Sequence, residues 1–74
     1  MAAPVLLYVK AGCVHCDRAR DELASRGVRV VEIDVGRERQ AIPELLKLTG
    51  GRRVVPVIVE GGKIAVAPEG GSEF

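Results

Sequence analysis

The chain has 74 residues, 11 of them basic and 10 acidic, so its formal net charge is +1. Nearly half of the residues are apolar, which excludes a disordered tail; we expect one small domain spanning residues 1–74, with a thin core that buries about 60% of the unfolded surface. The balanced charge and the two aromatic residues, Tyr8 and Phe74, argue against a nucleic-acid binder. There is neither an apolar stretch approaching a membrane span of about 20 residues nor a basic secretory leader, so we expect a cytoplasmic protein that does not bind membranes.

The first half of the chain predicts a strand, a helix and a second strand. Residues 5–9 form a short apolar run rich in strand formers, which is typical of a buried strand. Residues 14–26 carry apolar side chains at helical spacing opposite a charged face, and Gly27 stands where a glycine ends a helix. Residues 28–34 predict the second strand. A crossover this short implies that the two strands are parallel and the connection right-handed.

The second half predicts a helix, a hairpin and the beginning of another helix. Residues 37–49 are helical in pattern, but Pro43 intrudes, so we expect a restart with Pro43 in the first turn or a kinked helix. Residues 54–60 and 63–67 predict two strands around a Gly-Gly hairpin turn. The tail predicts a loop and the first residues of a helix with Ser72 as N-cap. The order β-α-β-α-β-β indicates an α/β sandwich with a four-stranded mixed sheet.

The two cysteines form the motif Cys13-Val14-His15-Cys16, which follows a strand and opens a helix. Unpaired N–H groups and the helix dipole favour an anion at a helix N-terminus, so Cys13 should ionise more easily than a free thiol. Cys16 lies one turn further in and is better shielded. A C-x-x-C motif beside a βαβ unit is a redox signature. A lowered pKa makes Cys13 a good leaving group, which suits a reversible disulfide carrier.

Other interpretations of this motif stay open at this point. The cysteines can be buried small hydrophobic residues, or a thiolate pair for zinc or copper(I), although zinc prefers four ligands and the motif offers only Cys13, Cys16 and His15. His15 either stabilises the Cys13 thiolate or carries protons, or it is a solvent-facing loop residue. We favour the redox interpretation and expect no bound metal.

Three segments resemble the glutaredoxin family. Residues 7–16, which end in the C-x-x-C motif, resemble its active-site segment, and residues 48–59 resemble its threonine–glycine turn and the Val-Pro strand that follows. The segment Gly70-Gly71-Ser72-Glu73 is similar to the double-glycine segment that opens the family's last helix. The sequence departs from the family pattern at His15, where tyrosine or phenylalanine is usual, and in a longer connection after the Val-Pro strand. It ends at Phe74, so we expect the last helix to be short or missing.

The resemblance implies a thioredoxin-like fold in which the bond between Val55 and Pro56 is cis and faces the cysteines. The backbone of Val55 would pair with an extended peptide or with the cysteinyl part of glutathione. Lys10 would meet a glutathione carboxylate, whereas Arg52 and Arg53 either help Lys10 or are surface charges. The substrate-binding residues implied in this way are Lys10, Val55, Pro56, Gly71 and Ser72.

The resemblance also implies a thiol-disulfide oxidoreductase with Cys13 as nucleophile and Cys16 as resolving thiol. Glutathione would be a co-substrate rather than a bound cofactor, and glutathione or a flavin-dependent reductase would restore the dithiol. We expect a monomer acting on glutathione or on disulfide-bearing proteins. The alternative is a soluble metal carrier using Cys13 and Cys16, because the motif and the following helix also resemble heavy-metal-associated domains. Their βαββαβ order does not fit the helix predicted between the second and third strands. A binding domain without turnover is a third interpretation.

Overall fold

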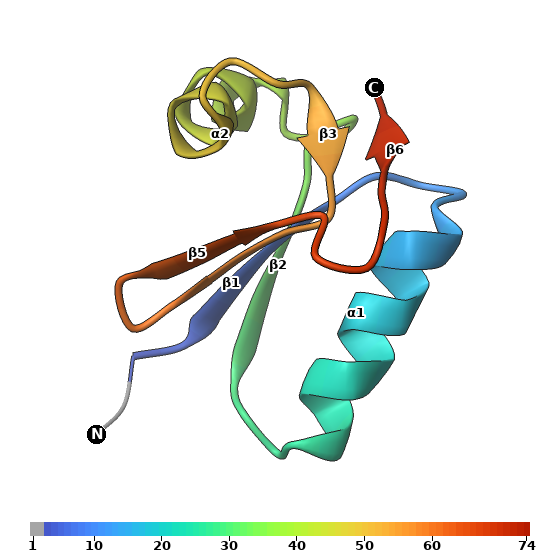
Figure 1. Ribbon diagram of the computed structural model, residues 1–74, viewed down its shortest axis with the longest axis vertical. Helices are drawn as coiled ribbons and strands as arrows, with labels where there is room; N and C mark the ends of the chain where they lie inside the picture. The colour runs from blue at the N-terminus through green and yellow to red at the C-terminus, as the bar shows by residue number, and fades with distance from the viewer. Residues whose placement is uncertain (1–2) are drawn as a thin grey trace.

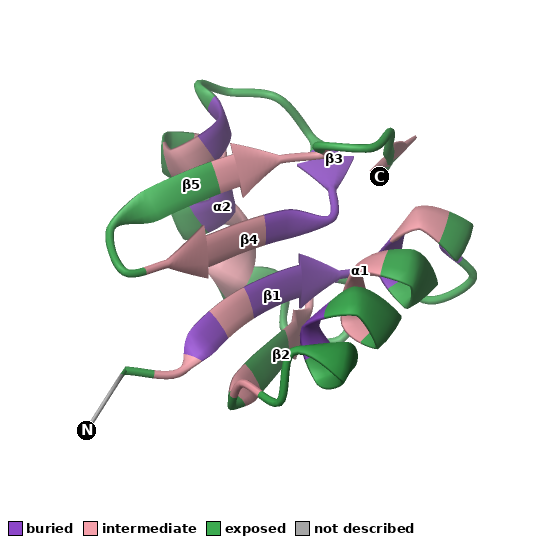
Figure 2. Ribbon diagram, turned by 60° about the horizontal axis from the view of Figure 1, so that its bottom comes forward, coloured by how far each residue is buried: buried purple, intermediate pink, exposed green. Residues whose placement is uncertain are grey.

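The computed structural model describes residues 3–74, which form a mixed sheet with α1 and α2 on opposite faces (Figures 1 and 2). The elements in chain order are β1 (Val5–Val9), α1 (Val14–Ser25), β2 (Val30–Asp34), the 3-10 turn η1 (Arg39–Ala41), α2 (Ile42–Thr49), β3 (Val54–Val55), β4 (Val57–Glu60), β5 (Lys63–Val66) and β6 (Ser72–Glu73). None of the helices in this described part is long and apolar enough to cross a membrane.

The main sheet has the strand order β2-β1-β4-β5, so β1 and β4 are its two inner strands. The strand β1 runs parallel to β2 and antiparallel to β4, which in turn pairs antiparallel with β5. The connection through α1 thus joins two parallel neighbours, as the sequence predicts. The four-stranded mixed sheet and the thioredoxin-like order of elements are confirmed.

The two helices begin and end at residues with identifiable roles. The N-cap of α1 is Cys13, and Gly27 follows the helix with a φ of 69°. The helix α2 starts after η1 with Pro43 in its first turn, so the predicted helix restarts at the proline and is not kinked by it. Gly50 ends α2 in the left-handed conformation, with a φ of 71°, which a glycine adopts without steric cost.

The predicted strand 54–60 is divided at Pro56, which separates β3 from β4. Proline has no N–H to donate to a ladder, so an unbroken central strand is disfavoured there. The Val55–Pro56 peptide bond is cis, as the family resemblance implies. The predicted two-residue hairpin turn is confirmed, because Gly61 and Gly62 both have positive φ angles, of 55° and 83°, as a type I′ turn requires.

The expectation of a helix beginning at Ser72 is wrong. Ser72–Glu73 is the strand β6, which pairs antiparallel with β3 to form a separate two-stranded ladder (Figure 1). A lone N-cap contributes about 1 kcal/mol, and here the unpaired edge of β3 offers backbone hydrogen bonds that a helix at this position would forgo. The last segment of the chain is therefore drawn along the edge of β3.

The core lies between the sheet and the helices, and buried residues concentrate in β1, β3 and the first half of β4 (Figure 2). Leu7 of β1, Leu45 of α2 and Val57 of β4 are fully buried. Both cysteines belong to the same buried cluster, with Cys13 at 1% exposure and Cys16 at 0%. The motif is thus anchored in the core at the point where β1 leads into α1.

Candidate active site

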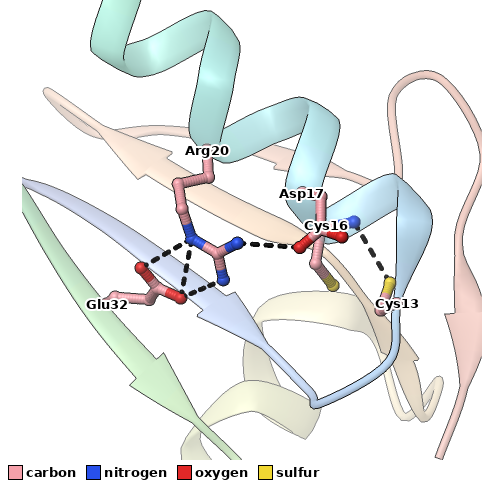
Figure 3. Close-up of polar contacts among 5 residues, drawn as sticks. All are labelled: Cys13, Cys16, Asp17, Arg20 and Glu32. Atoms are coloured by element: carbon pink, nitrogen blue, oxygen red, sulfur yellow. Dashed lines mark hydrogen bonds and ion pairs between the residues drawn. The ribbon is translucent and has the colours of Figure 1, made fainter.

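Cys13 caps the helix α1 with its sulfur. Its Sγ accepts a hydrogen bond of 3.1 Å from the backbone N–H of Cys16 (Figure 3). This is the place where a side-chain acceptor satisfies one of the unpaired N–H groups of a helix N-terminus. Negative charge on the Cys13 sulfur is therefore stabilised by the helix itself, as its position in the sequence predicts.

The two thiols differ in acidity. Burial raises the pKa of Cys13, but hydrogen bonds from the Cys16 thiol, the Ser72 hydroxyl and the backbone N–H groups of His15 and Cys16 outweigh it, so the net pKa is lowered. Burial and the hydrogen bond with Cys13 raise the pKa of Cys16 to about 12. The thiolate of the pair therefore forms more readily on Cys13, whereas Cys16 keeps its proton at neutral pH.

The wall opposite Cys13 is formed by the ladder of β3 and β6. Val55 is fully buried and pairs with Ser72, whose Oγ lies 3.6 Å from Cys13 Sγ. The protonated thiol donates this hydrogen bond, and the thiolate accepts it from the Ser72 hydroxyl. Lys10 Nζ donates to the backbone oxygen of Glu73 at 2.7 Å. The structure thus brings Lys10, Cys13, Val55 and Ser72 together, four of the residues that the sequence assigns to the site.

A hydrogen-bonded turn sets the position of β3. Thr49 Oγ1 donates to the backbone oxygen of Arg52 at 2.6 Å and accepts from its backbone N–H at 3.0 Å. Gly50 and Gly51 between them both adopt positive φ, at 71° and 93°. The threonine side chain closes this turn and directs the chain into Val54 and Val55.

His15 lies in the first turn of α1 and is half-buried, so its interpretation as a solvent-facing loop residue is wrong. Its ring packs against Gly70 and lines a cavity of about 260 Å³ between α1 and the loop before β6. Its Nδ1 is buried and has no hydrogen-bond partner in the described part of the chain. The backbone N–H of His15 is one of the groups that lower the pKa of Cys13.

Arg20 is a residue near the site that the sequence analysis missed. It donates to Asp17 at 2.7 Å and to both carboxylate oxygens of Glu32, at 3.1 and 3.0 Å, which joins α1 to β2 (Figure 3). Its positive charge also acts to lower the pKa of Cys16, against the larger effect of burial. The helical spacing of Asp17 and Arg20 is visible in the sequence, but the contact with Glu32 depends on the parallel crossover.

Within residues 3–74, no three His, Cys, Asp or Glu side chains are grouped so that they could hold a metal ion. A tetrahedral zinc site needs four ligands, and Cys13 and Cys16 supply two. The chemistry that this arrangement supports is that of an activated thiolate beside a protonated thiol.

We predict that iodoacetamide alkylates Cys13 before Cys16 in the reduced protein, and well below pH 8. The thiolate is the reactive form, the pKa of Cys13 is lowered, and that of Cys16 is about 12. Mass spectrometry of the labelled peptide over a series of pH values measures both rates. Equal labelling, or labelling of Cys16 first, would contradict the assigned acidities.

Comparison with known proteins identifies the family of this chain. A family model described as Glutaredoxin matches residues 5–65. The Gene 56 protein of Mycobacterium phage L5 is 33% identical over 57 residues, which are 77% of this chain and 54% of that protein, so the chain spans about half the length of this curated relative. The crystal structure of a glutaredoxin from Archaeoglobus fulgidus superposes with a TM-score of 0.76 and 28% identity, over 99% of this chain and 78% of the other.

Proposed function

The chain belongs to the glutaredoxin family, and we propose that it reduces protein disulfides or glutathione mixed disulfides with Cys13 as nucleophile and Cys16 as resolving thiol. One observation carries this proposal. A thiol with a lowered pKa and a thiol with a raised pKa are placed one helical turn apart, beside the strand β3, which pairs with an extended segment at its edge.

The proposed reaction has two exchange steps. The Cys13 thiolate attacks one sulfur of the substrate disulfide, and the other sulfur leaves as a thiolate that takes a proton from solvent. Cys16 then loses its proton and attacks Cys13 Sγ, which forms the Cys13–Cys16 disulfide and releases the second substrate thiol. The substrate gains two electrons and two protons, which glutathione or a flavin-dependent reductase later returns to the cysteine pair.

The first exchange step lowers the pKa of Cys16, the thiol that acts in the second step. The pKa of Cys16 is raised partly by its hydrogen bond with Cys13 and by the negative charge of the Cys13 sulfur. Once Cys13 is bound in a mixed disulfide, that charge is gone and the hydrogen bond is changed. The pKa of Cys16 then falls, although burial, the largest cause of its rise, remains, so the resolving thiol is more reactive in the mixed disulfide than in the free dithiol.

The substrate groove that we propose runs along β3. The backbone of Val55, beside Pro56, would pair with the cysteinyl part of glutathione or with a peptide. Lys10 would bind a carboxylate, and Gly71 and Ser72 would adjoin the bound cysteine. We propose further that the protein acts as a cytoplasmic monomer, with glutathione as co-substrate and without a resident cofactor.

An assay with two electron sources tests the proposed function. Reduction of a small disulfide is followed by NADPH oxidation, once with glutathione and glutathione reductase and once with thioredoxin reductase. We expect turnover with at least one of the two sources, and the faster source identifies the donor. Absence of turnover with both, for a folded and fully reduced protein, would overturn the proposal.

A further inference from the structure

The buried thiol of Cys16 has to become a thiolate before it can act. In the resolving step its proton goes to solvent and its Sγ attacks Cys13 Sγ. The bond between Cys13 and the substrate breaks, and the substrate sulfur leaves as a thiolate that takes up a proton. Cys16 is 0% exposed, and burial is the largest cause of its raised pKa. A charge held near this sulfur therefore affects the step more strongly than it would affect a thiol in water.

Arg20 is a charged residue in the right place to act on Cys16. It follows Cys16 by four residues in α1, so the two side chains lie one turn apart on the same face of the helix. The positive charge of Arg20 is among the causes that lower the pKa of Cys16, whereas the causes that lower the pKa of Cys13 are hydrogen bonds. The charge of Arg20 thus bears on the second thiol rather than on the first.

Two carboxylates hold the Arg20 guanidinium in place. Nη1 donates to Asp17 at 2.7 Å, and Nε donates to both carboxylate oxygens of Glu32 on β2, at 3.1 and 3.0 Å (Figure 3). We call these three side chains the Arg20 bridge. The contacts raise the pKa of Arg20, so its charge does not titrate in the range where thiols do. Because the carboxylates offset part of that charge, removing Arg20 and removing Glu32 change the field at Cys16 in opposite directions.

We propose that Arg20 is a positioning residue of the resolving step, in which the Arg20 bridge fixes a positive charge one helical turn from Cys16 and stabilises the thiolate that attacks Cys13 Sγ. This role rests on the proposed function and concerns its second exchange step. A lower pKa gives more thiolate but a weaker nucleophile, so about half of the gain survives on a logarithmic scale. The Arg20 side chain is 42% exposed, and water therefore screens its charge. We expect an effect of about two- to fivefold on the rate.

The uncharged disulfide dithiodipyridine measures the resolving step without enzymatic turnover. Attack by Cys13 releases one coloured thiopyridone at a rate that depends on the concentration of the reagent. Attack by Cys16 on the resulting mixed disulfide releases a second thiopyridone at a rate that does not, and forms the Cys13–Cys16 disulfide. Stopped-flow absorbance with equimolar reagent separates the two phases. Cys16→Ser should show only the first phase.

Arg20→Gln should slow the second phase about two- to fivefold and shift its pH profile to higher pH, while the first phase is unchanged. Arg20→Lys keeps the positive charge, so its second phase should stay within about twofold of the wild type. Arg26→Gln is the matched control. Arg26 caps the end of α1 and pairs with Glu60 of β4 at 2.5 Å, with a side-chain exposure of 43%. This variant should match the wild type in both phases.

Glu32→Gln separates the charge of Arg20 from the bridge as a structural contact. It breaks the same contact between α1 and β2, but it removes a negative charge, and Asp17 still holds Arg20 at 2.7 Å. Its second phase should be at least as fast as that of the wild type. Slowing equal to that of Arg20→Gln would show that the bridge acts through structure alone, and would overturn the proposal.

The same data distinguish a failure of the role of Arg20 from a failure of the proposed function. If the wild type never releases the second thiopyridone, Cys16 is not a resolving thiol, and both are refuted. If the second phase has the same rate and pH profile in the wild type and in Arg20→Gln, only the role of Arg20 is refuted. Circular dichroism checks that each variant is folded.

Discussion

Cys13→Ser is expected to reduce the disulfide-reductase activity by at least about a hundredfold, because a serine hydroxyl does not ionise near neutral pH and cannot replace the thiolate nucleophile. The fold should be unaffected. Cys13 is the N-cap of α1 and accepts from the N–H of Cys16, and serine is among the preferred residues at an N-cap. The same assay used for the wild type, together with a thermal melt, separates the loss of chemistry from a loss of structure.

Cys16→Ser provides the complementary result. Without the resolving thiol, the first exchange still forms a mixed disulfide on Cys13, and that species accumulates. Mass spectrometry after incubation with oxidised glutathione should show one glutathione added to this variant and none added to Cys13→Ser. If Cys13→Ser instead retains activity while Cys16→Ser is inactive and carries no adduct, the two cysteines have the opposite roles.

Most of the fold follows from local patterns in the sequence. The runs of strand formers, the helical spacing of apolar residues and the terminating glycines each act within a few residues, so they predict the β-α-β-α-β-β order. The division at Pro56 is harder to predict, because the residues on both sides are valines with a strong strand preference. The strand β6 is harder still. Its partner β3 lies about 18 residues earlier in the chain, and the local signal at Ser72 is that of an N-cap.

Some features of the candidate site could likewise be predicted from the sequence, and others could not. The acidic position of Cys13 follows from a motif placed at a helix N-terminus, and the positions of Lys10, Val55 and Ser72 follow from the family resemblance. The sequence does not predict that Ser72 Oγ lies against Cys13 Sγ, nor that Arg53 stacks on Phe74. Both contacts join segments that are distant in the sequence, and each depends on the register of β3 with β6. The orientation of the His15 ring toward Gly70 is unpredictable for the same reason.

A second large effect is expected when a core residue beneath the candidate site is truncated. Leu7→Ala should lower the free energy of unfolding by about 2–5 kcal/mol, because Leu7 is 0% exposed in the central strand and its loss leaves a cavity. The whole chain of 74 residues is expected to be stable by only about 4–11 kcal/mol. The variant therefore loses a large part of its stability. A measurable fraction of the variant protein should be unfolded at about 37 °C, below the usual melting range of such domains.

Ile64→Ala is the matched control, since it removes a similar aliphatic side chain from the edge strand β5, where 47% of the residue is exposed. Its effect should stay below about 1 kcal/mol. Urea denaturation followed by circular dichroism measures both changes. Because only residues 10–12 separate β1 from Cys13, the Leu7→Ala protein should also alkylate faster at Cys16, which in the native state is 0% exposed. Equal unfolding midpoints for the two variants would show that the buried face of β1 does not hold the site together.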